Sequence, residues 1–399
     1  MKKFQNFKTN CFYKTICYLL FCFIFIIFIL SIKAFGETYI SSEHSFWKSY
    51  KETFIKDLSK DKGAIVVDNH FNFAPSEGMG HALIFAAQNW DWKTFNYLLK
   101  GLENFKKSNG LFRWKINSDA SFPSSDDNLS SASETEQNVA YALLLAYEAT
   151  GKKIYKDQAL ELLSKIWEGE TISLQGKRVV LPADFTDNNP KWPVEYYGDR
   201  SIKIAAWNPS YFSPRMYRKF ADYDLVHDWN KVVADGYALL NSTLDRVMEE
   251  PKRFGIYGMN PVPAWVWLVP IGGAQIKIDT YFPNFYQPDP YVSNEWDTIR
   301  IPIYIGMDAS SFEAQKFLEK FFKYAKVEKP QDALIGKLPG YNNEMAIGAY
   351  SVGLKAIGRD VSSFKEKIKI EDDGFFVGPR IYYHQTICNY AYIILNGEF

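Results

Sequence analysis

Apolar residues recur at helical spacing in one segment after another from residue 45 onward, and this repetition limits the possible folds more than any other feature of the chain. Loops rich in Pro, Asn, Asp and aromatic residues separate the segments. Predicted helices cover residues 45–61, 77–90, 92–108, 134–150, 154–167, 210–221, 227–248, 296–307, 310–326, 343–357 and 382–396. Short strands or hairpins are expected at 172–182 and 254–280. Helix pairs joined alternately by short and long loops favour an all-α toroid with a cleft at one end.

The first 36 residues do not belong to this pattern. Lysines at positions 2, 3, 8 and 14 precede an uncharged run from Ile16 to Ile32, and Ala34-Phe35-Gly36 offers small residues for cleavage. This arrangement is typical of a secretory signal peptide over residues 1–36, so we expect an exported protein, secreted or periplasmic. An uncleaved membrane anchor is the alternative, because the run reaches the lower limit for spanning a bilayer. No low-complexity linker interrupts residues 40–399, which predicts a single domain over 37–399.

Charge and cysteine content exclude several classes of protein. The 399-residue chain has 46 basic and 46 acidic residues, so no charge bias favours nucleic acid. Three of the four cysteines lie in the leader, which leaves Cys388 alone, and no zinc-type ligand spacing is present. Aromatic residues make up 17% of the chain. They pack cores, but in a groove they also stack on the apolar faces of sugar rings.

The first of three acidic motifs is Pro75-Ser76-Glu77-Gly78-Met79-Gly80, directly before an apolar run. Ser76 is a good helix N-cap and Met79 begins a helical repeat, so Glu77 is expected in the first turn of a helix. The two glycines leave bare backbone beside the carboxylate, where a ligand can approach. The structural alternative is that Glu77 only complements the helix dipole.

The second acidic motif is Ser133-Glu134-Thr135-Glu136, again at the start of an apolar helix. Ser133 and Glu136 have the spacing of a capping box, in which Glu136 would bond back to the Ser133 amide. Glu134 has no such structural task. It lies at the N-terminal end of its helix, as Glu77 does.

The third acidic motif is Glu295-Trp296-Asp297-Thr298-Ile299-Arg300. Asp297 and Arg300 are i,i+3 neighbours, a spacing that usually gives a weak surface salt bridge. Apolar residues flank this pair on nearly every side, which favours a buried helix instead. A buried acid beside a buried arginine indicates a functional site.

Taken in this order, the motifs resemble glycoside hydrolase family 8, the family of bacterial endoglucanases, related xylanases and chitosanases. The resemblance runs from about residue 45 to the C-terminus. Four segments carry most of it: Ser76-Glu77-Gly78-x-Gly80, Ala132-Ser133-Glu134-Thr135-Glu136, Trp207-Asn208-Pro209-Ser210-Tyr211 and Trp296-Asp297-x-x-Arg300. It implies an (α/α) barrel of six helical hairpins, a β-linked polysaccharide as substrate, a monomer, and no metal or organic cofactor.

The resemblance also implies roles for individual residues. Glu77 would be the general acid and Asp297 the general base of an inverting, endo-acting hydrolysis. The family residue at the position of Glu134 holds the distorted sugar, and a carboxylate there would also raise the pKa of Glu77. Tyr211 and Arg300 would position the attacking water.

Departures from the family pattern indicate an altered substrate. Both signature aspartates are glutamates here, so Glu134 is expected to reach further and crowd the sugar beside the scissile bond, which argues against plain cellulose. His81 replaces a usual Tyr; it would contact sugar hydroxyls or be a non-catalytic histidine. Among the tryptophans at 90, 92, 114, 192 and 207, Trp114 is the first choice for sugar stacking, and at least half are expected in the core. The remaining substrate-binding candidates are Asn208 and Glu136.

Two rival hypotheses remain. A non-catalytic glycan-binding protein on the same scaffold would explain the altered signature, although binding alone requires no acid–base pair. A membrane-tethered enzyme that trims chains in exopolysaccharide synthesis would explain the leader as an anchor.

Overall fold

The computed structural model describes residues 46–123, 130–184, 195–197, 200–202, 204–249, 261–272, 275–279, 297–333 and 344–397 of the chain. Within these residues the fold is mainly helical, with a few short strands. The predicted leader, residues 1–36, lies outside the described residues. In the part of the chain that the structure describes, no helix has the length and apolar character needed to cross a membrane.

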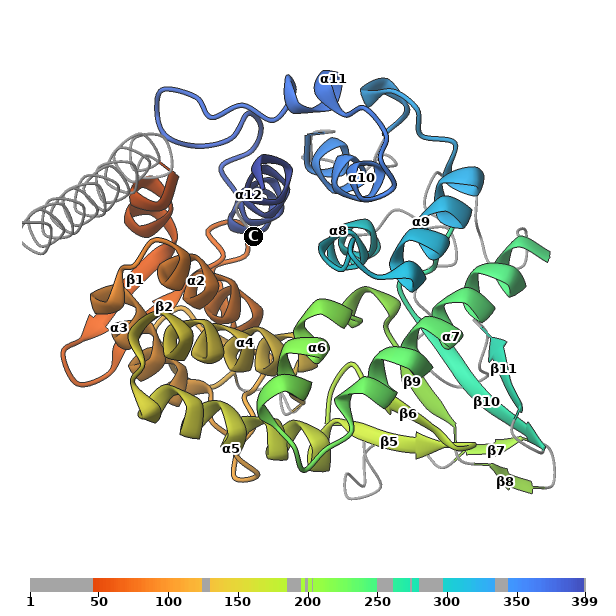
Figure 1. Cartoon of the computed structure of the whole chain (residues 1–399). Helices are drawn as coiled ribbons and strands as arrows, with labels where there is room; N and C mark the ends of the chain where they lie inside the picture. The colour runs from red at the N-terminus through yellow and green to blue at the C-terminus, as the bar shows by residue number, and fades with distance from the viewer. Residues whose placement is uncertain are drawn as a thin grey trace, which may run out of the picture.

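Six of the described helices form a closed inner ring (Figure 1). Each packs against the next in chain order, and the last packs back against the first. The ring consists of α2 (Ser76–Gln88), α4 (Ser133–Thr150), α6 (Pro214–Tyr223), α8 (Arg300–Met307), α10 (Glu344–Ala356) and α12 (Tyr382–Asn396).

A second layer of helices surrounds the ring. Each of α2, α4, α6, α8 and α10 packs against the outer helix that follows it in the chain. The outer helices are α3 (Trp92–Leu102), α5 (Lys153–Gly169), α7 (Trp229–Glu249), α9 (Phe312–Ala325) and α11 (Ser362–Lys365), and residues 46–54 are helical as well. This arrangement confirms the predicted (α/α) barrel of six helical hairpins.

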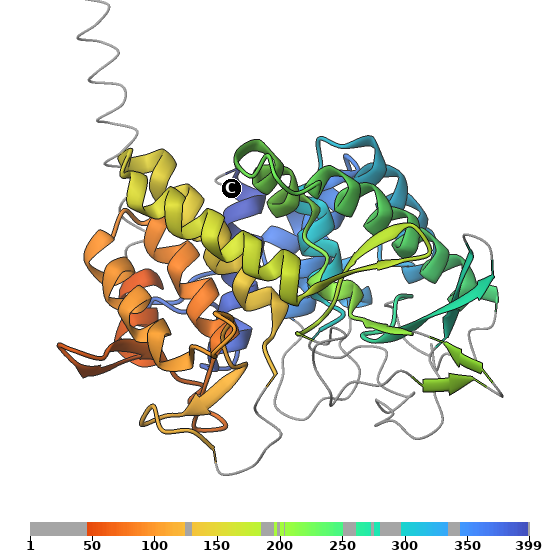
Figure 2. The same cartoon turned by 90° about the horizontal axis from the view of Figure 1, so that it is seen from below.

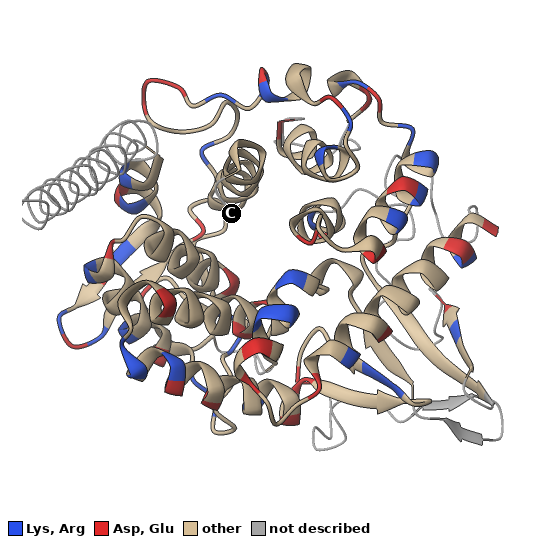
Figure 3. Ribbon diagram, viewed as in Figure 1, with Lys and Arg blue, Asp and Glu red and all other residues tan. Residues whose placement is uncertain are grey.

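The two layers differ in sequence because they differ in burial. The inner helices α2, α8, α10 and α12 are buried on almost every side and carry few charges, and α12 has none (Figure 3), whereas the inner helix α6 is amphipathic and exposes charged residues. In α2 and α8 the single charged residues are Glu77 and Arg300. Outer helices are amphipathic: α5 buries Tyr155, Ala159, Leu162, Leu163 and Ile166 at helical spacing and exposes its other face.

One glycine of the first acidic motif permits the close contact between α2 and α4. A Cβ atom on Gly80 would lie 2.7 Å from the Cβ of Asn138, closer than side chains pack. Glycine at this position therefore lets the N-terminal ends of the two helices, with Glu77 and Glu134, come together.

The strands pair as short antiparallel ribbons. They are β1 (Ile55–Ser59) with β2 (Gly63–Val66), β3 (Phe73–Pro75) with β4 (Lys115–Asn117), β5 (Thr171–Leu174) with β6 (Lys177–Val180), β7 (Glu195–Tyr197) with β8 (Arg200–Ile202), and β9 (Ala205–Trp207) and β11 (Gln275–Asp279) on either side of β10 (Val266–Gly272). Strands β5 to β11 lie together on one flank of the barrel in both views (Figures 1 and 2). The predicted hairpin at 172–182 is confirmed, and the described part of 254–280 contains β10 and β11.

Several predicted helix boundaries are wrong. The helix predicted over 45–61 stops at residue 54, because Ile55–Ser59 pairs with the buried strand β2 instead. The prediction over 92–108 combines α3 with the 3₁₀ helix η1 (Glu103–Phe105). The helix predicted from residue 210 begins at Pro214, after the 3₁₀ helix η3 (Pro209–Tyr211). Helix α11 and the 3₁₀ helix η4 (Pro330–Asp332) were not predicted.

Candidate active site

The N-terminal ends of inner helices bring the predicted site residues together. Glu77 and Glu134 lie in the first turns of α2 and α4, Arg300 begins α8, and Tyr383 is the second residue of α12. Tyr211 ends η3, shortly before α6. Helix N-termini carry unpaired N–H groups and positive partial charge, so this end of the barrel favours acidic side chains.

Arg300 is the centre of the cluster. Its side chain is only 2% exposed and forms ion pairs with Glu134 through Nη1 and with Asp297 through Nη2. Nη1 also lies 4.0 Å from Oε1 of Glu77. The guanidinium carbon is 4.9 Å from the ring centre of Tyr211 and 5.7 Å from that of Tyr383. The Asp297–Arg300 pair is therefore part of a buried network, as the flanking apolar residues predicted, rather than a surface salt bridge.

Glu134 is buried, and both of its carboxylate oxygens are engaged. One pairs with Arg300, and the other accepts a hydrogen bond from the hydroxyl of Tyr304 and lies 3.7 Å from Nε2 of His81. Burial alone would raise the pKa of Glu134, but Arg300, His81 and Tyr304 outweigh burial and hold it at about 2. Both carboxylate oxygens of Glu134 thus have protein partners, and the expectation that this side chain crowds the sugar beside the scissile bond stays a prediction.

Glu77 has the opposite electrostatic environment. Its side chain is 18% exposed, and Oε1 accepts a hydrogen bond from the Tyr211 hydroxyl at 3.0 Å. Burial first, and then the negative charge of Glu134, raise the pKa of Glu77 to about 7, although Arg300 opposes them. This direction agrees with the one expected from a carboxylate at the position of Glu134.

Asp297 is the more exposed of the two candidate catalytic carboxyls, at 26%. Its Oδ2 accepts a hydrogen bond from Nδ2 of Asn208 at 3.0 Å, and Oδ1 pairs with Arg300. Asn208 is itself buried and fixed, because its Oδ1 accepts hydrogen bonds from the amide of Ser210 at 3.0 Å and from the Ser210 hydroxyl. The structure thus places Asn208, predicted as substrate-binding, where it orients Asp297.

His81 is fully buried, with its ring 5.5 Å from that of Tyr390 and its Nε2 beside Glu134. It does not lie at the surface where Glu77 and Asp297 are exposed. This burial favours the second alternative predicted, a non-catalytic histidine, over contact with sugar hydroxyls.

Both predicted helix caps are wrong. Helix α2 begins at Ser76 itself, and the Ser76 hydroxyl is hydrogen-bonded to that of Thr135 at 2.7 Å. Helix α4 begins at Ser133, whose amide donates to the carbonyl oxygen of Pro182 at 3.0 Å. The expected bond from Glu136 to the Ser133 amide is therefore replaced, and Glu136 accepts from the amide of Phe112 at 2.8 Å.

Glu136 belongs to a second buried acidic cluster, behind the site. Burial first, and then Glu170, raise the pKa of Glu136 well above its ordinary value. Burial and Asp184 raise the pKa of Glu170 to about 8, although a hydrogen bond from Ser131 opposes them. One oxygen of each glutamate has no hydrogen-bond partner within the described residues, and the one cation of the cluster, Lys107, pairs with Asp184. Two adjacent buried carboxyls with too few donors are stable only when they retain a proton.

The tryptophan candidates differ in burial and in their position relative to Glu77. Trp114 is half-buried beside the first acidic motif, and its carbonyl oxygen accepts a hydrogen bond from the Ser76 amide at 2.8 Å. Trp207 is in the core. Trp90 is 66% exposed, just after the C-terminal end of α2 and therefore far from Glu77, while Trp92 is partly buried beside it. Trp192 lies outside the described residues.

Three site residues were missed by the sequence analysis. Tyr304 lies four residues after Arg300 on α8, so helical spacing could have placed it on the same face. Tyr383 is the second residue of the closing helix α12. The Ser210 hydroxyl is 3.3 Å from Nη2 of Arg300, but apart from its place in the motif around Asn208 nothing in the sequence marks Ser210.

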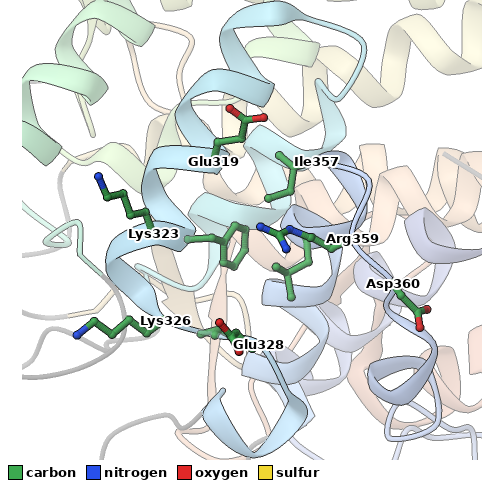
Figure 4. A pocket seen from close by; sticks show the side chains of 10 residues that line it. Glu319, Lys323, Lys326, Glu328, Ile357, Arg359 and Asp360 are labelled. Atoms are coloured by element: carbon green, nitrogen blue, oxygen red, sulfur yellow. The ribbon is translucent and has the colours of Figure 1, made fainter.

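A separate groove of about 970 Å³ lies between α9 and the end of α10 (Figure 4). Charged side chains, among them Lys323, Lys326 and Arg359, surround apolar ones such as Phe322 and Leu354. None of the predicted site residues lines this groove.

Fold and site together define an (α/α) barrel whose inner helices present carboxyl groups and an arginine at their N-terminal ends. Among such proteins, the chain belongs to glycosyl hydrolases family 8, whose family model matches residues 27–361.

Characterised relatives and solved structures agree with this assignment. The chain is 26% identical over 265 residues to an endoglucanase of Cellulomonas uda, covering 65% of this chain and 62% of that protein. It is 27% identical over 193 residues to endoglucanase A of Acetivibrio thermocellus, covering 48% of this chain and 35% of that protein. The chain thus spans less than two thirds of the length of these relatives.

The fold matches two solved structures over most of their length. For the family 8 endoglucanase Cel10 of Klebsiella pneumoniae, the TM-score is 0.61 at 21% identity, covering 89% of this chain and 100% of that one. For the β-1,3-1,4-glucanase of Paenibacillus sp. X4, the TM-score is 0.69 at 20% identity, covering 90% and 92%. At this level of identity, the matches show a common fold.

The buried glutamate pair predicts a loss of stability with rising pH. In the unfolded chain Glu170 is ionised above its ordinary pKa of 4.5, whereas in the folded protein it keeps its proton up to about pH 8. Unfolding therefore releases a proton in this window, and the free energy of unfolding falls as the pH rises toward and through about 8. Glu170→Gln, which mimics the protonated acid, should lose less stability over the same window.

The measurement is urea denaturation from about pH 5 to about pH 9 for the natural protein, for Glu170→Gln and for a control, Glu161→Gln, on the exposed face of α5. The control should follow the natural protein. Parallel curves for the natural protein and Glu170→Gln would contradict the shared proton.

Proposed function

We propose that the protein is an exported, endo-acting hydrolase of β-linked polysaccharides, similar to an endo-β-1,4-glucanase, and that it inverts the anomeric centre. The observation that carries the proposal is the pair Glu77 and Asp297. These two carboxyls are partly exposed at the same end of the barrel, and both lie against one buried guanidinium. Hydrolysis of a glycosidic bond requires an acid and a base in such an arrangement.

Glu77 is proposed as the general acid. A pKa of about 7 keeps its carboxyl largely protonated in mildly acidic solution and about half protonated at neutral pH. In the reaction the proton of Glu77 moves to the oxygen that links the two sugars, and the bond from the anomeric carbon to that oxygen breaks. The leaving chain departs with a new hydroxyl group, and Glu77 is left ionised.

Asp297 is proposed as the general base. A water molecule attacks the anomeric carbon from the opposite face and passes a proton to the Asp297 carboxylate, which forms the second product with inverted configuration. Asn208 and Arg300 fix the direction of this carboxylate. Exchange of protons with solvent then restores both carboxyls.

Tyr211 and Arg300 are proposed to bind at the reaction centre. The hydroxyl of Tyr211 donates to Glu77, and its ring lies over Arg300, so this side chain is well placed to orient both the acid and the attacking water. Glu134 is proposed to act from behind them, by keeping Arg300 in place and raising the pKa of Glu77.

The substrate class follows from the family and from the relatives. Glu134 pairs with Arg300, and whether it also disfavours plain cellulose is a question for the substrate comparison. We therefore propose a β-linked glucan, whose linkage a comparison of carboxymethylcellulose, lichenan and xylan would identify.

Glu77→Gln and Asp297→Asn should each lower kcat by about 10²- to 10⁴-fold, because each removes a proton transfer and leaves the side-chain volume almost unchanged. Glu161→Gln, an exposed variant on α5, should keep full activity. Thermal unfolding of all three variants checks that the fold is intact. If either catalytic variant retains activity near that of the natural protein, that residue does not have the proposed role.

The anomeric configuration of the first-formed product tests the mechanism independently. Proton NMR during hydrolysis of a β-glucan should show the α-anomer at the new reducing end before mutarotation. Initial formation of the β-anomer would indicate a retaining mechanism and overturn the assignment of Asp297 as a base for water.

Glu134→Gln should move the alkaline limb of the kcat/KM–pH profile toward lower pH. The negative charge of Glu134 raises the pKa of Glu77, and without it Arg300 acts on Glu77 more strongly in the lowering direction. Tyr304→Phe keeps the charge of Glu134 and should move the limb less. An alkaline limb at the same pH in the natural protein and Glu134→Gln would show that Glu77 is not the group that titrates there.

Export predicts a defined N-terminus for the mature protein. Expressed in a secreting bacterial host, the protein should be recovered outside the cytoplasm with an N-terminus near Glu37. Recovery of intact residues 1–36 on membrane-associated protein would support the membrane anchor instead.

A further inference from the structure

A row of aromatic rings leads away from the proposed acid. The rings of Phe71 and Phe73 are 6.1 Å apart with planes 27° from parallel, and those of Phe73 and Trp114 are 5.9 Å apart at 73°. Strand β3, which contains Phe73, runs directly into Ser76 and Glu77, and the Ser76 amide is bonded to the Trp114 carbonyl. Strand β3 and the Ser76–Trp114 hydrogen bond therefore connect the row of rings directly to the first turn of α2, which carries Glu77.

The ring at the outer end of the row, that of Phe71, is exposed to solvent. Phe71 is 57% exposed, at the tip of a turn fixed by the buried Asp68. The carboxylate of Asp68 accepts hydrogen bonds from the amides of His70 at 2.8 Å and Phe71 at 3.1 Å, and its carbonyl oxygen accepts from the amide of Asn72 at 2.7 Å. A single exposed ring is ordinary, but a contiguous row on a fixed turn indicates a surface that binds something.

Trp114 is less open than Phe71. Nζ of Lys115 lies 4.2 Å from the ring centre of Trp114 and 5.4 Å from that of Phe73. A cation at this distance occupies a ring face. Among the described residues, no carboxylate lies within ion-pair distance of Lys115, so its ammonium group is held mainly by the rings. Phe71 is the most exposed ring of the row and so the most accessible to a flat apolar ligand, although the ring of His70 also contacts it, with ring centres 4.5 Å apart and planes at 75°.

We propose that Phe71, backed by Phe73, is a distal binding position for the polysaccharide, on which a sugar ring stacks while another part of the same chain lies at Glu77 and Asp297. This inference rests on the proposed function. Strand β3 alone separates Phe73 from Pro75 by about 7 Å, and the Phe71 ring lies a further 6.1 Å from that of Phe73, so a glycan that occupies both the site and Phe71 is longer than one that fills the site alone. The row is one ring wide and continuous with the site, which suits a linear glycan better than the broad face of a protein partner.

The experiment separates binding from hydrolysis. In the Glu77→Gln background, isothermal titration with cellohexaose and cellotriose compares Phe71→Ala with the unmodified residue, with Phe71→Tyr, which keeps the ring, and with Phe312→Ala. Phe312 is 74% exposed at the start of α9 and serves as a matched surface control.

Loss of one stacked ring should weaken cellohexaose binding about three- to tenfold and cellotriose binding less, because the shorter chain does not reach Phe71 from the site. Phe71→Tyr and Phe312→Ala should bind cellohexaose as the parent does. The proposal is overturned if Phe71→Ala binds cellohexaose with unchanged affinity, if both ligands lose affinity equally, or if cellohexaose does not bind the parent. These outcomes are distinct from failure of the proposed function, which is measured by hydrolysis in the natural protein.

Discussion

The buried ion pair between Arg300 and Glu134 is the interaction on which the site depends. It joins the first turns of α8 and α4, and the same guanidinium holds Asp297 and lies 4.0 Å from Glu77. Buried charges are stable only when paired, and loss of one partner typically costs about 3–5 kcal/mol. Helices α2 and α8 carry no charged residue other than Glu77 and Arg300, so this pair fixes the relative positions of the three acidic side chains.

The pair also explains how neighbouring carboxyls can take different protonation states. Glu134 has donors or cations at both oxygens, which stabilise its ionised form, whereas Glu77 accepts one hydrogen bond and faces a fixed negative charge. The pKa values of about 2 and about 7 follow from these surroundings. The ionised Glu134 thereby helps to keep the neighbouring Glu77 protonated, which is the state that a general acid requires. The second glutamate pair, Glu136 and Glu170, is similarly buried, but among the described residues no arginine pairs with it, and both pKa values are raised, which favours retention of a proton.

Much of the fold and of the site was predictable from local patterns. Helical spacing located most helices, and the three acidic motifs supplied Glu77, Glu134, Asp297 and Arg300. Local rules failed where tertiary contacts replaced them: the amides of Ser76 and Ser133 bond to Trp114 and Pro182 on distant segments, so neither serine is an N-cap. The direction of Glu134 was also not predictable, since it depends on Tyr304 and Arg300 reaching it from another helix. The exposed row ending at Phe71 has no sequence signature, because exposure of a ring is a property of the folded turn.

The pKa of Glu77 is the most direct test of this account. It can be measured by carbon NMR of the side-chain carboxyls in protein labelled with ¹³C-glutamate, with the resonance assigned by its absence in Glu77→Gln. The account predicts a titration midpoint near pH 7 in the natural protein. A midpoint near the ordinary glutamate value of 4.5 would show that burial and Glu134 do not control this carboxyl, and would contradict its assignment as the general acid.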